Sequence, residues 1–186
     1  GENSLTFTRL SCDGEEGYPG NLLVSVRYTF DDECRLGIHY QALCDQDTVI
    51  NLTNHSYFNL DGEDSESVEG QHLQIFADSF AENDAGCLPT GRIVSLDSEE
   101  GAPFDFREPT EIGKRLHEEN IHLKNGSGYD HNYLLKKQPD GLCARAYSRS
   151  SGILLECRTS EPGMQLYTGN FLSTSNIVGK GGKSYA

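Results

Sequence analysis

The chain has 186 residues, a formal net charge of −14 and 35% hydrophobic residues, and its length predicts a single domain across residues 1–186. Because phosphate binding needs clustered Lys and Arg, the acidic balance argues against a nucleic-acid partner, an anionic membrane surface and a phosphorylated substrate. Neutral polar ligands stay compatible with it, and the longest apolar runs are far too short to span a membrane.

The first part of the chain alternates apolar and polar side chains with a period of two, which is typical of half-buried strands. Residues 1–10, 23–30 and 36–42 show this pattern. A stretch rich in Gly and Pro at residues 13–20 and an acidic turn at residues 31–33 separate these strands.

Residues 51–60, read as an extended strand, carry one polar face and one face that is apolar at both ends. The polar face holds His55 among amides, a hydroxyl and a phenol, so the strand can form the wall of a polar cleft with His55 as a candidate site residue. The alternative is a histidine that its neighbours satisfy on a solvated sheet face, and spacing alone does not separate the two.

The middle of the chain is mostly loop. An acidic loop is expected at residues 61–70, a strand at 72–78 with Leu73, Ile75 and Ala77 inward, and mostly loop at 81–93. Residues 110–118 hold the one predicted helix, because Ile112 and Leu116 lie one turn apart and Thr110 can cap it.

The last part predicts three consecutive antiparallel strands at residues 133–137, 142–148 and 153–159, separated by turns, then a strand at 164–171. Residues after Asn176 are expected to be loop. Many short strands with at most one or two short helices predict an all-β fold, an antiparallel β-sandwich.

The six cysteines are scattered, with no Cys-x-x-Cys pair and no Cys/His grouping of zinc spacing. We therefore expect no zinc site. Disulfides stay an open alternative for an even number of cysteines, but free thiols in a reducing compartment are favoured for a domain of this size. No basic stretch followed by an apolar run marks a signal peptide, so we expect a cytoplasmic protein.

Several motifs resemble a known family when taken in order. They are NLTNHSYFNL (51–60), GYDHNY (128–133) and TSEPGMQLYTGNFL (159–172), together with DGEEGYPGNL (13–22) and PFDFR (103–107). They resemble the aldose 1-epimerases, or galactose mutarotases, over essentially the whole chain. The resemblance implies a large antiparallel sandwich, the supersandwich, and the interconversion of α and β anomers of free hexoses such as galactose and glucose, without metal or cofactor.

The resemblance also implies site roles. His55 matches the general acid, Asp130 matches a carboxylate that binds sugar hydroxyls, and Gln165 matches a substrate-binding glutamine. His131 is interpreted as structural, and Tyr167 as a core tyrosine that can alternatively pack on a sugar ring.

The family's glutamate base is expected beyond the last residue, and an arginine and a second histidine before the first. We therefore expect a chain that is incomplete at both ends and that lacks the base when it is alone. Glu161 is the one base candidate within the chain, although the resemblance assigns it to a turn. A non-catalytic sugar-binding or regulatory domain on the same fold is the main alternative, and a hexose 6-phosphate epimerase would need cationic side chains that the motifs lack.

Overall fold

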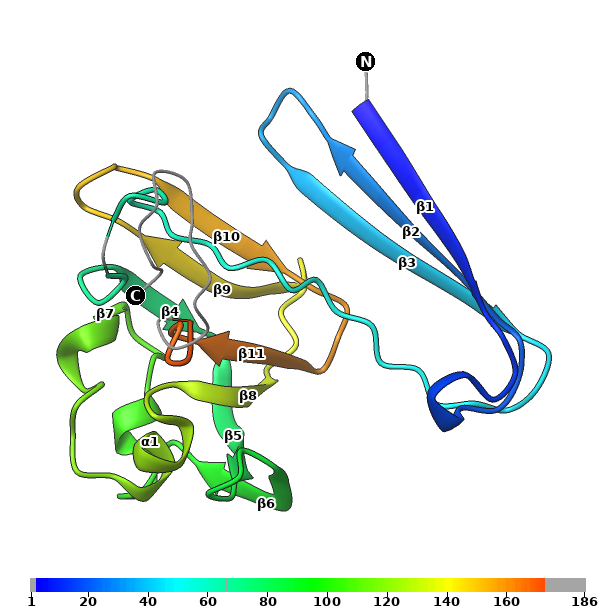
Figure 1. Ribbon diagram of the computed structural model, residues 1–186. Coiled ribbons are helices and arrows are strands. Elements are labelled where there is room, and N and C mark those ends of the chain that lie inside the picture. Colours follow the sequence, from blue (N-terminus) through cyan, green and yellow to red (C-terminus); the bar gives the residue numbers. More distant parts are fainter. Residues whose placement is uncertain (1–2, 66, 173–186) are drawn as a thin grey trace. The chain divides into compact units, whose positions relative to one another are not determined.

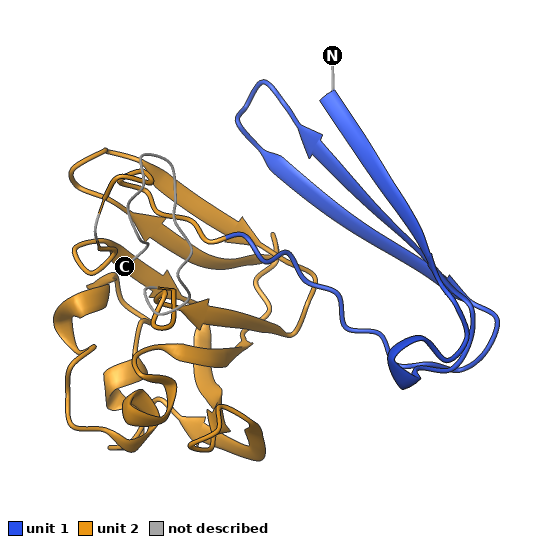
Figure 2. Ribbon diagram, viewed as in Figure 1, with its two compact units in different colours: residues 1–56 blue, residues 57–186 orange. Residues whose placement is uncertain are grey.

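The structure is a computed structural model that describes residues 3–65 and 67–172. The chain divides into two compact units, Gly1–Ser56 and Tyr57–Ala186 (Figure 2). The loop predicted after Asn176 lies outside the described residues. No helix in the described part of the chain is long and apolar enough to cross a membrane.

The first unit is built on a three-stranded antiparallel sheet in the order β1-β2-β3 (Figure 1). The strands are β1 (Asn3–Ser11), β2 (Leu22–Phe30) and β3 (Leu36–Cys44), which confirms the three predicted strands. A short 3-10 turn, η1 (Glu15–Gly17), lies between β1 and β2. Phe7 pairs with Val26 and Val26 with Tyr40, so most of the apolar positions of the three strands share one face.

The second unit contains two four-stranded antiparallel sheets, in the orders β10-β9-β4-β7 and β11-β8-β5-β6 (Figure 1). Their strands are β4 (His72–Ile75), β5 (Ala77–Asn83), β6 (Pro89–Ser95), β7 (Thr110–Glu111), β8 (Asp130–Leu135), β9 (Leu142–Tyr147), β10 (Leu154–Arg158) and β11 (Gly163–Tyr167). The all-β antiparallel class is therefore confirmed.

The run β4–β5 passes from one sheet to the other at Phe76. The N–H of Phe76 donates to the carbonyl oxygen of Cys143 in β9 (2.9 Å), and its own carbonyl oxygen accepts from Lys136 after β8 (2.7 Å). A single run of alternating apolar residues therefore contributes one strand to each of the two sheets. Its predicted inward residues, Leu73, Ile75 and Ala77, are buried as expected.

Aromatic side chains fill the core of the second unit. Phe80 stacks on Phe104 with ring centroids 4.3 Å apart. The hydroxyl of Tyr129 donates to the carbonyl oxygen of Pro103 (2.8 Å), and that of Tyr133 to the carbonyl oxygen of Phe104 (2.9 Å). The short 3-10 turn η2 (Ala102–Phe104) supplies both acceptors. Buried tyrosines need such partners, so the turn fixes β8 by polar as well as apolar contacts.

The predicted helix at residues 110–118 is wrong. This stretch forms β7 and a 3-10 turn, η3 (Ile112–Lys114), because the N–H groups of Ile112 and Gly113 donate to the carbonyl oxygens of Gln71 and Glu69. The α-helix of the described chain is α1 (Ile121–Gly126). Asn120 caps it by accepting from the N–H groups at its first turn.

Two further expectations differ from the structure. The region expected to be mostly loop, residues 81–93, instead forms most of a β5–β6 hairpin, because Gly86 and its neighbours only make the connection. The three consecutive strands are only partly confirmed: β9 and β10 pair with each other, but β8 pairs with β5 and β11. The β8–β9 turn therefore crosses between sheets.

The segment at residues 51–60 is not a strand, which corrects the sequence-based prediction. It has no ladder partner, and its backbone is tied by its own polar side chains instead. Asn54 accepts from the N–H of Ser56 (3.1 Å), and Asn59 accepts from the N–H of Asp61 (3.1 Å). Short polar side chains offer the backbone these local bonds in competition with a sheet. The expected burial of the apolar face is found only at Leu60, whereas Phe58 is exposed.

Candidate functional site

Two of the predicted site residues meet on one face of the β8–β11 pair. Tyr167 pairs directly with Asp130, and Gln165 pairs with Asn132. Directly opposed residues share a face, so the side chains of Asp130 and Gln165 lie on the same side of the ladder. The amide Nε2 of Gln165 donates to Oδ1 of Asp130 at 2.7 Å. This bond orients the carboxylate and the amide towards each other.

The reverse face of the same ladder belongs to the core. His131 and Tyr133 are fully buried there, and Met164 and Leu166 pack against the same cluster. Asp130 is half-buried and Gln165 is exposed on the opposite side. The two strands therefore present hydrogen-bonding groups outward from an apolar support, which holds them in place.

Two tyrosines border the carboxylate. The ring of Tyr57 lies against that of Tyr167, with centroids 5.4 Å apart and an interplanar angle of 48°. The pKa of the Tyr57 phenol is raised by partial burial and by the neighbouring Tyr167 and Asp130, so it stays protonated at neutral pH. The hydroxyl of Tyr167 accepts from the N–H of Phe171 (2.9 Å). Because Tyr167 is the strand partner of Asp130, the Tyr57 and Tyr167 rings form an aromatic edge beside Asp130.

The backbone of Asp130 is held on both sides. Its carbonyl oxygen accepts from Nδ2 of the buried Asn83 (2.8 Å), and its N–H donates to Nδ1 of His131 (3.1 Å). Asn125 in turn donates from Nδ2 to the carbonyl oxygen of Asn83 (2.9 Å). These contacts fix where the Asp130 side chain leaves the sheet.

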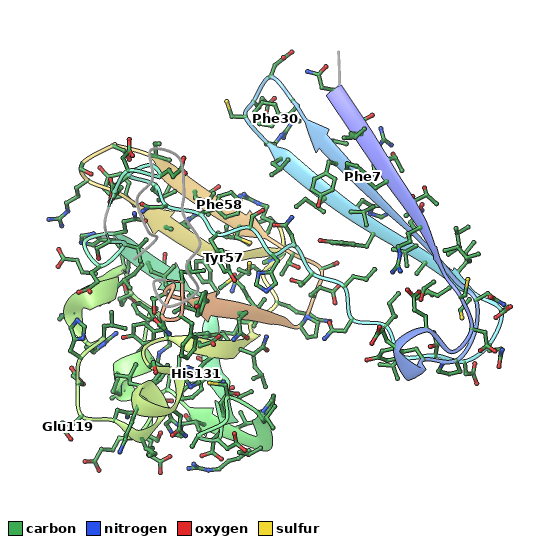
Figure 3. All side chains as sticks on the ribbon, viewed as in Figure 1. Phe7, Phe30, Tyr57, Phe58, Glu119 and His131 are labelled. Carbon is green, nitrogen blue, oxygen red and sulfur yellow. The ribbon has the colours of Figure 1, made fainter. Side chains whose placement is uncertain are left out.

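His131 has a structural role, as interpreted from the sequence. Its ring, labelled in Figure 3, is buried. The ring centroids of Phe80 and Phe104 lie 5.2 and 4.7 Å from it. Burial, with a smaller effect from His122, lowers the pKa of His131 to about 4. The ring is therefore neutral at neutral pH, and its Nδ1 acts as the acceptor for Asp130.

His55 lies in the first unit, at the centre of the short turn that Asn54 closes. Asn54 itself is half-buried, and its Nδ2 donates to the hydroxyl of Tyr28 in β2 (3.4 Å). The imidazole is exposed. The structure therefore places His55 in one unit, and Asp130 with Gln165 in the other.

The first unit has a hollow of about 240 Å³ that brings two of the family-like motifs together. Tyr18, Pro19 and Gly20 line it from residues 13–22, and Asn51 and Leu52 line it from residues 51–60. Two stretches far apart in sequence are thus neighbours beside the turn that carries His55.

Glu161 lies in the exposed connection between β10 and β11, where its N–H donates to the hydroxyl of Thr159 (3.1 Å). This confirms the predicted turn. The register places Gly163 opposite Leu134, whereas Asp130 faces Tyr167 at the other end of the pair. With a strand rise of about 3.3 Å per residue, Glu161 is separated from Asp130 by most of the length of β11.

Sequence reasoning placed the phenol of Tyr57 beside His55 but did not connect it with Asp130, and it did not assign Asn132 to the site. Asn132 follows Asp130 by two residues, and strand alternation was the signal that places both on one face. The proximity of Tyr57 to Asp130 follows only from its contact with Tyr167. In the part of the chain that the structure describes, no three His, Cys, Asp or Glu side chains gather as a metal site.

A family model described as Aldose 1-epimerase matches residues 2–185. The chain belongs to the aldose 1-epimerase family. Among curated relatives in this family, the chain is 45% identical to the galactose mutarotase of Rattus norvegicus over 98% of its length, which is 51% of that protein. It is 38% identical to the aldose 1-epimerase of Escherichia coli over 92% of the chain and 49% of the relative.

Solved structures of the aldose 1-epimerase family share this fold. A galactose 1-epimerase from Lactobacillus acidophilus aligns over 94% of the chain and 49% of that protein, with a TM-score of 0.81 and 30% identity. An aldose epimerase homologue from C. elegans aligns over 98% of the chain and 52% of that protein, with a TM-score of 0.82 and 31% identity. The chain thus spans about half the length of the relatives that it matches.

Proposed function

We propose that the protein containing this chain interconverts the α and β anomers of a free hexose such as galactose or glucose. The observation that supports this best is the Asp130–Gln165 pair, held 2.7 Å apart on the polar face of β8–β11 in a chain of the aldose 1-epimerase family. The chain's similarity to relatives named galactose mutarotase and aldose 1-epimerase supports the same proposal.

The chemistry of mutarotation requires two proton transfers. A base removes the proton of the anomeric hydroxyl while an acid protonates the ring oxygen, so that the C1–ring oxygen bond breaks and an open aldehyde forms. Rotation about the C1–C2 bond and closure by the reverse transfers give the other anomer. We assign the acid to His55, since imidazole exchanges protons near neutral pH.

Asp130 and Gln165 serve as sugar-binding groups. An ionised carboxylate has acceptor capacity on both oxygens, so Asp130 can accept from sugar hydroxyls in addition to Gln165. The Gln165 amide both donates and accepts, and a hydroxyl can do the same. We do not assign the base to Glu161, because it lies near the opposite end of the strand pair.

We further propose one domain that includes both units, since the family match spans residues 2–185. A cytoplasmic location is supported by the six cysteines, all of which are described and have free thiols. The carboxylate at the polar face favours an uncharged sugar over a hexose phosphate, because like charges repel.

Polarimetry of freshly dissolved α-galactose tests the assignment. The His55→Ala variant of the full-length protein should lose roughly 10²- to 10⁴-fold in kcat with little change in KM, as expected for a group that acts in the transition state. His39→Ala is the matched control, because His39 is an exposed histidine of β3 in the same unit.

A kcat near that of the parent protein in His55→Ala would remove His55 from the mechanism. A parent protein that binds galactose in calorimetry but equilibrates the anomers no faster than buffer would overturn the enzyme proposal. That result would favour a non-catalytic sugar-binding or regulatory domain.

A further inference from the structure

Two of the six cysteines face each other across the β9–β10 hairpin. Cys157 pairs with Ala144, and a β-bulge follows at Arg158, which pairs with Leu142. Cys143 is therefore the extra residue on β9, and it adjoins Ala144, the direct partner of Cys157. Directly opposed residues such as Ala144 and Cys157 have Cα atoms about 4.5–5.5 Å apart, so the bulge places Cys143 next to Cys157 across the hairpin.

The sulfur contacts agree with this register. The Sγ of Cys143 lies 3.3 Å from the carbonyl oxygen of Cys157 and 3.8 Å from Sδ of Met164. Cys143 is 2% exposed, and Cys157 packs against the same core cluster while staying half-buried. One thiol is therefore enclosed, and its partner is within reach of a small solute at the outer strand of the described sheet.

The two thiols differ in acidity. A hydrogen bond from the Cys143 thiol lowers the pKa of Cys157, because it stabilises the Cys157 thiolate. The same contact and burial raise the pKa of Cys143. Cys157 therefore ionises first, and the thiolate is the form that reacts with oxidants.

The other cysteines have different surroundings. Cys12 and Cys34 are exposed in the first unit, and Cys44 is half-buried there. Cys87 lies in the second unit like the pair, is half-buried like Cys157, and donates from Sγ to the carbonyl oxygen of Asn125 (3.4 Å). Cys87 is thus a matched internal reference for thiol reactivity.

We propose that Cys143 and Cys157 form an oxidant-sensitive dithiol site that hydrogen peroxide converts to a cross-strand disulfide. The Cys157 thiolate attacks one peroxide oxygen, the O–O bond breaks, and Cys157 becomes a sulfenic acid as the other oxygen leaves as water after taking up a proton. The Cys143 sulfur then attacks the Cys157 sulfur. The S–S bond forms, the S–O bond breaks, and the hydroxide leaves as water with the Cys143 proton.

In sum, two thiols are oxidised and one hydrogen peroxide is reduced to two waters. The site does not depend on the proposed sugar chemistry, because none of its atoms belongs to Asp130, Gln165 or His55. Met164 connects the dithiol site with the polar face of β8–β11, because it contacts Cys143 and precedes Gln165 in β11.

Peptide mapping by mass spectrometry of the full-length protein, after graded hydrogen peroxide and rapid alkylation, tests the proposal. Cys157 should lose alkylation about tenfold faster than Cys87, and the peptides of Cys143 and Cys157 should appear as one bridged species that dithiothreitol separates. In Cys143→Ser the bridge cannot form, so Cys157 should proceed to sulfinic acid. Cys87→Ser should leave the bridge intact.

Three results would overturn the proposal: Cys157 oxidised no faster than Cys87, a bridge from Cys157 to another cysteine, or sulfinic acid on Cys157 of the parent protein without a bridged peptide. The parent protein alone gives each of these readouts, so the test holds even where a serine variant fails to fold.

Discussion

Removing the Asp130 carboxylate should weaken sugar binding by an amount that follows from its hydrogen bonds. Oδ1 already accepts from Gln165 at 2.7 Å, and the remaining acceptor capacity would serve sugar hydroxyls. A hydrogen bond to a charged group contributes about 1.5–3 kcal/mol. Since 1.4 kcal/mol corresponds to a factor of ten, Asp130→Ala should raise KM roughly 10- to 150-fold.

Two related variants separate the charge from the shape. Asp130→Asn keeps an oxygen that can accept from Gln165 but loses the charge, and neutral bonds are about half as strong, so KM should rise roughly 3- to 12-fold. Gln165→Ala removes a neutral partner worth about 0.5–1.5 kcal/mol and should raise KM roughly 2- to 12-fold. The order Asp130→Ala, Asp130→Asn, Gln165→Ala is the expected ranking.

The assay is polarimetry over a range of galactose concentrations, with urea unfolding of each variant to establish that it is folded. Asp140→Asn and Gln138→Ala are the controls, because both residues lie in the turn after β8 and away from the polar face of β8–β11. An unchanged KM in both Asp130→Ala and Gln165→Ala would refute the binding assignment. A fall in kcat alone would move Asp130 from sugar binding to the proton transfers.

Three further outcomes are expected. Tyr133→Phe should lower the free energy of unfolding in urea by about 1–3 kcal/mol, because the Phe104 carbonyl loses its 2.9 Å donor, whereas the outward Tyr147→Phe should change it by less than about 0.5 kcal/mol. His131 has a folded pKa of about 4, so the unfolded state takes up its proton first as the pH falls. The free energy of unfolding should therefore drop by about 2 kcal/mol from pH 7 to pH 5, and His131→Gln should not show this drop. Glu161→Gln should keep the mutarotation rate within about twofold, and a loss above ~10²-fold would identify Glu161 as the base.

The sequence predicts well those strands whose apolar and polar alternation can be read from their own residues. β1, β2, β3 and β10 follow the alternation of their own residues, and β4 buries the expected side chains. The β8–β9 pairing was wrong because a short turn predicts a hairpin, whereas β8 makes its hydrogen bonds to β5 and β11. Sheet membership depends on partners distant in sequence, which periodicity does not contain.

The two helix errors have a common physical cause. Residues 110–118 have helical spacing, but Ile112 and Gly113 donate to the backbone before β4, and a glycine weakens the helix further. The six-residue α1 is too short to show a period, and the capping bonds of Asn120 set where it begins. In both places hydrogen bonds decide the structure where apolar spacing is uninformative.

For the candidate site, the sequence indicated candidate residues but not which of them lie together. The contact between Asp130 and Gln165 depends on the β8–β11 register, which follows from the packing of both strands on one core. The predicted strand at residues 51–60 failed because Asn54 and Asn59 bond the adjacent backbone themselves. Asn59 belongs to the polar face that favoured a site, whereas Asn54 belongs to the opposite face, so polar side chains on both faces compete with strand pairing.

The contacts around Asp130 explain why two separate motifs are long. A Cβ on Gly128 would lie 2.5 Å from Oδ1 of Asn170, so only a glycine leaves room for that amide, and φ at this position is +133°. Asn170 donates from Nδ2 to the carbonyl oxygens of Gly126 (2.8 Å) and Tyr129 (2.9 Å). The segment after β11 thus fixes the chain just before Asp130, while β11 itself brings Gln165 to the carboxylate. Motif residues other than Asp130 and Gln165 are therefore needed, because they fix the backbone from which the Asp130 carboxylate, the group we propose for sugar binding, leaves the sheet.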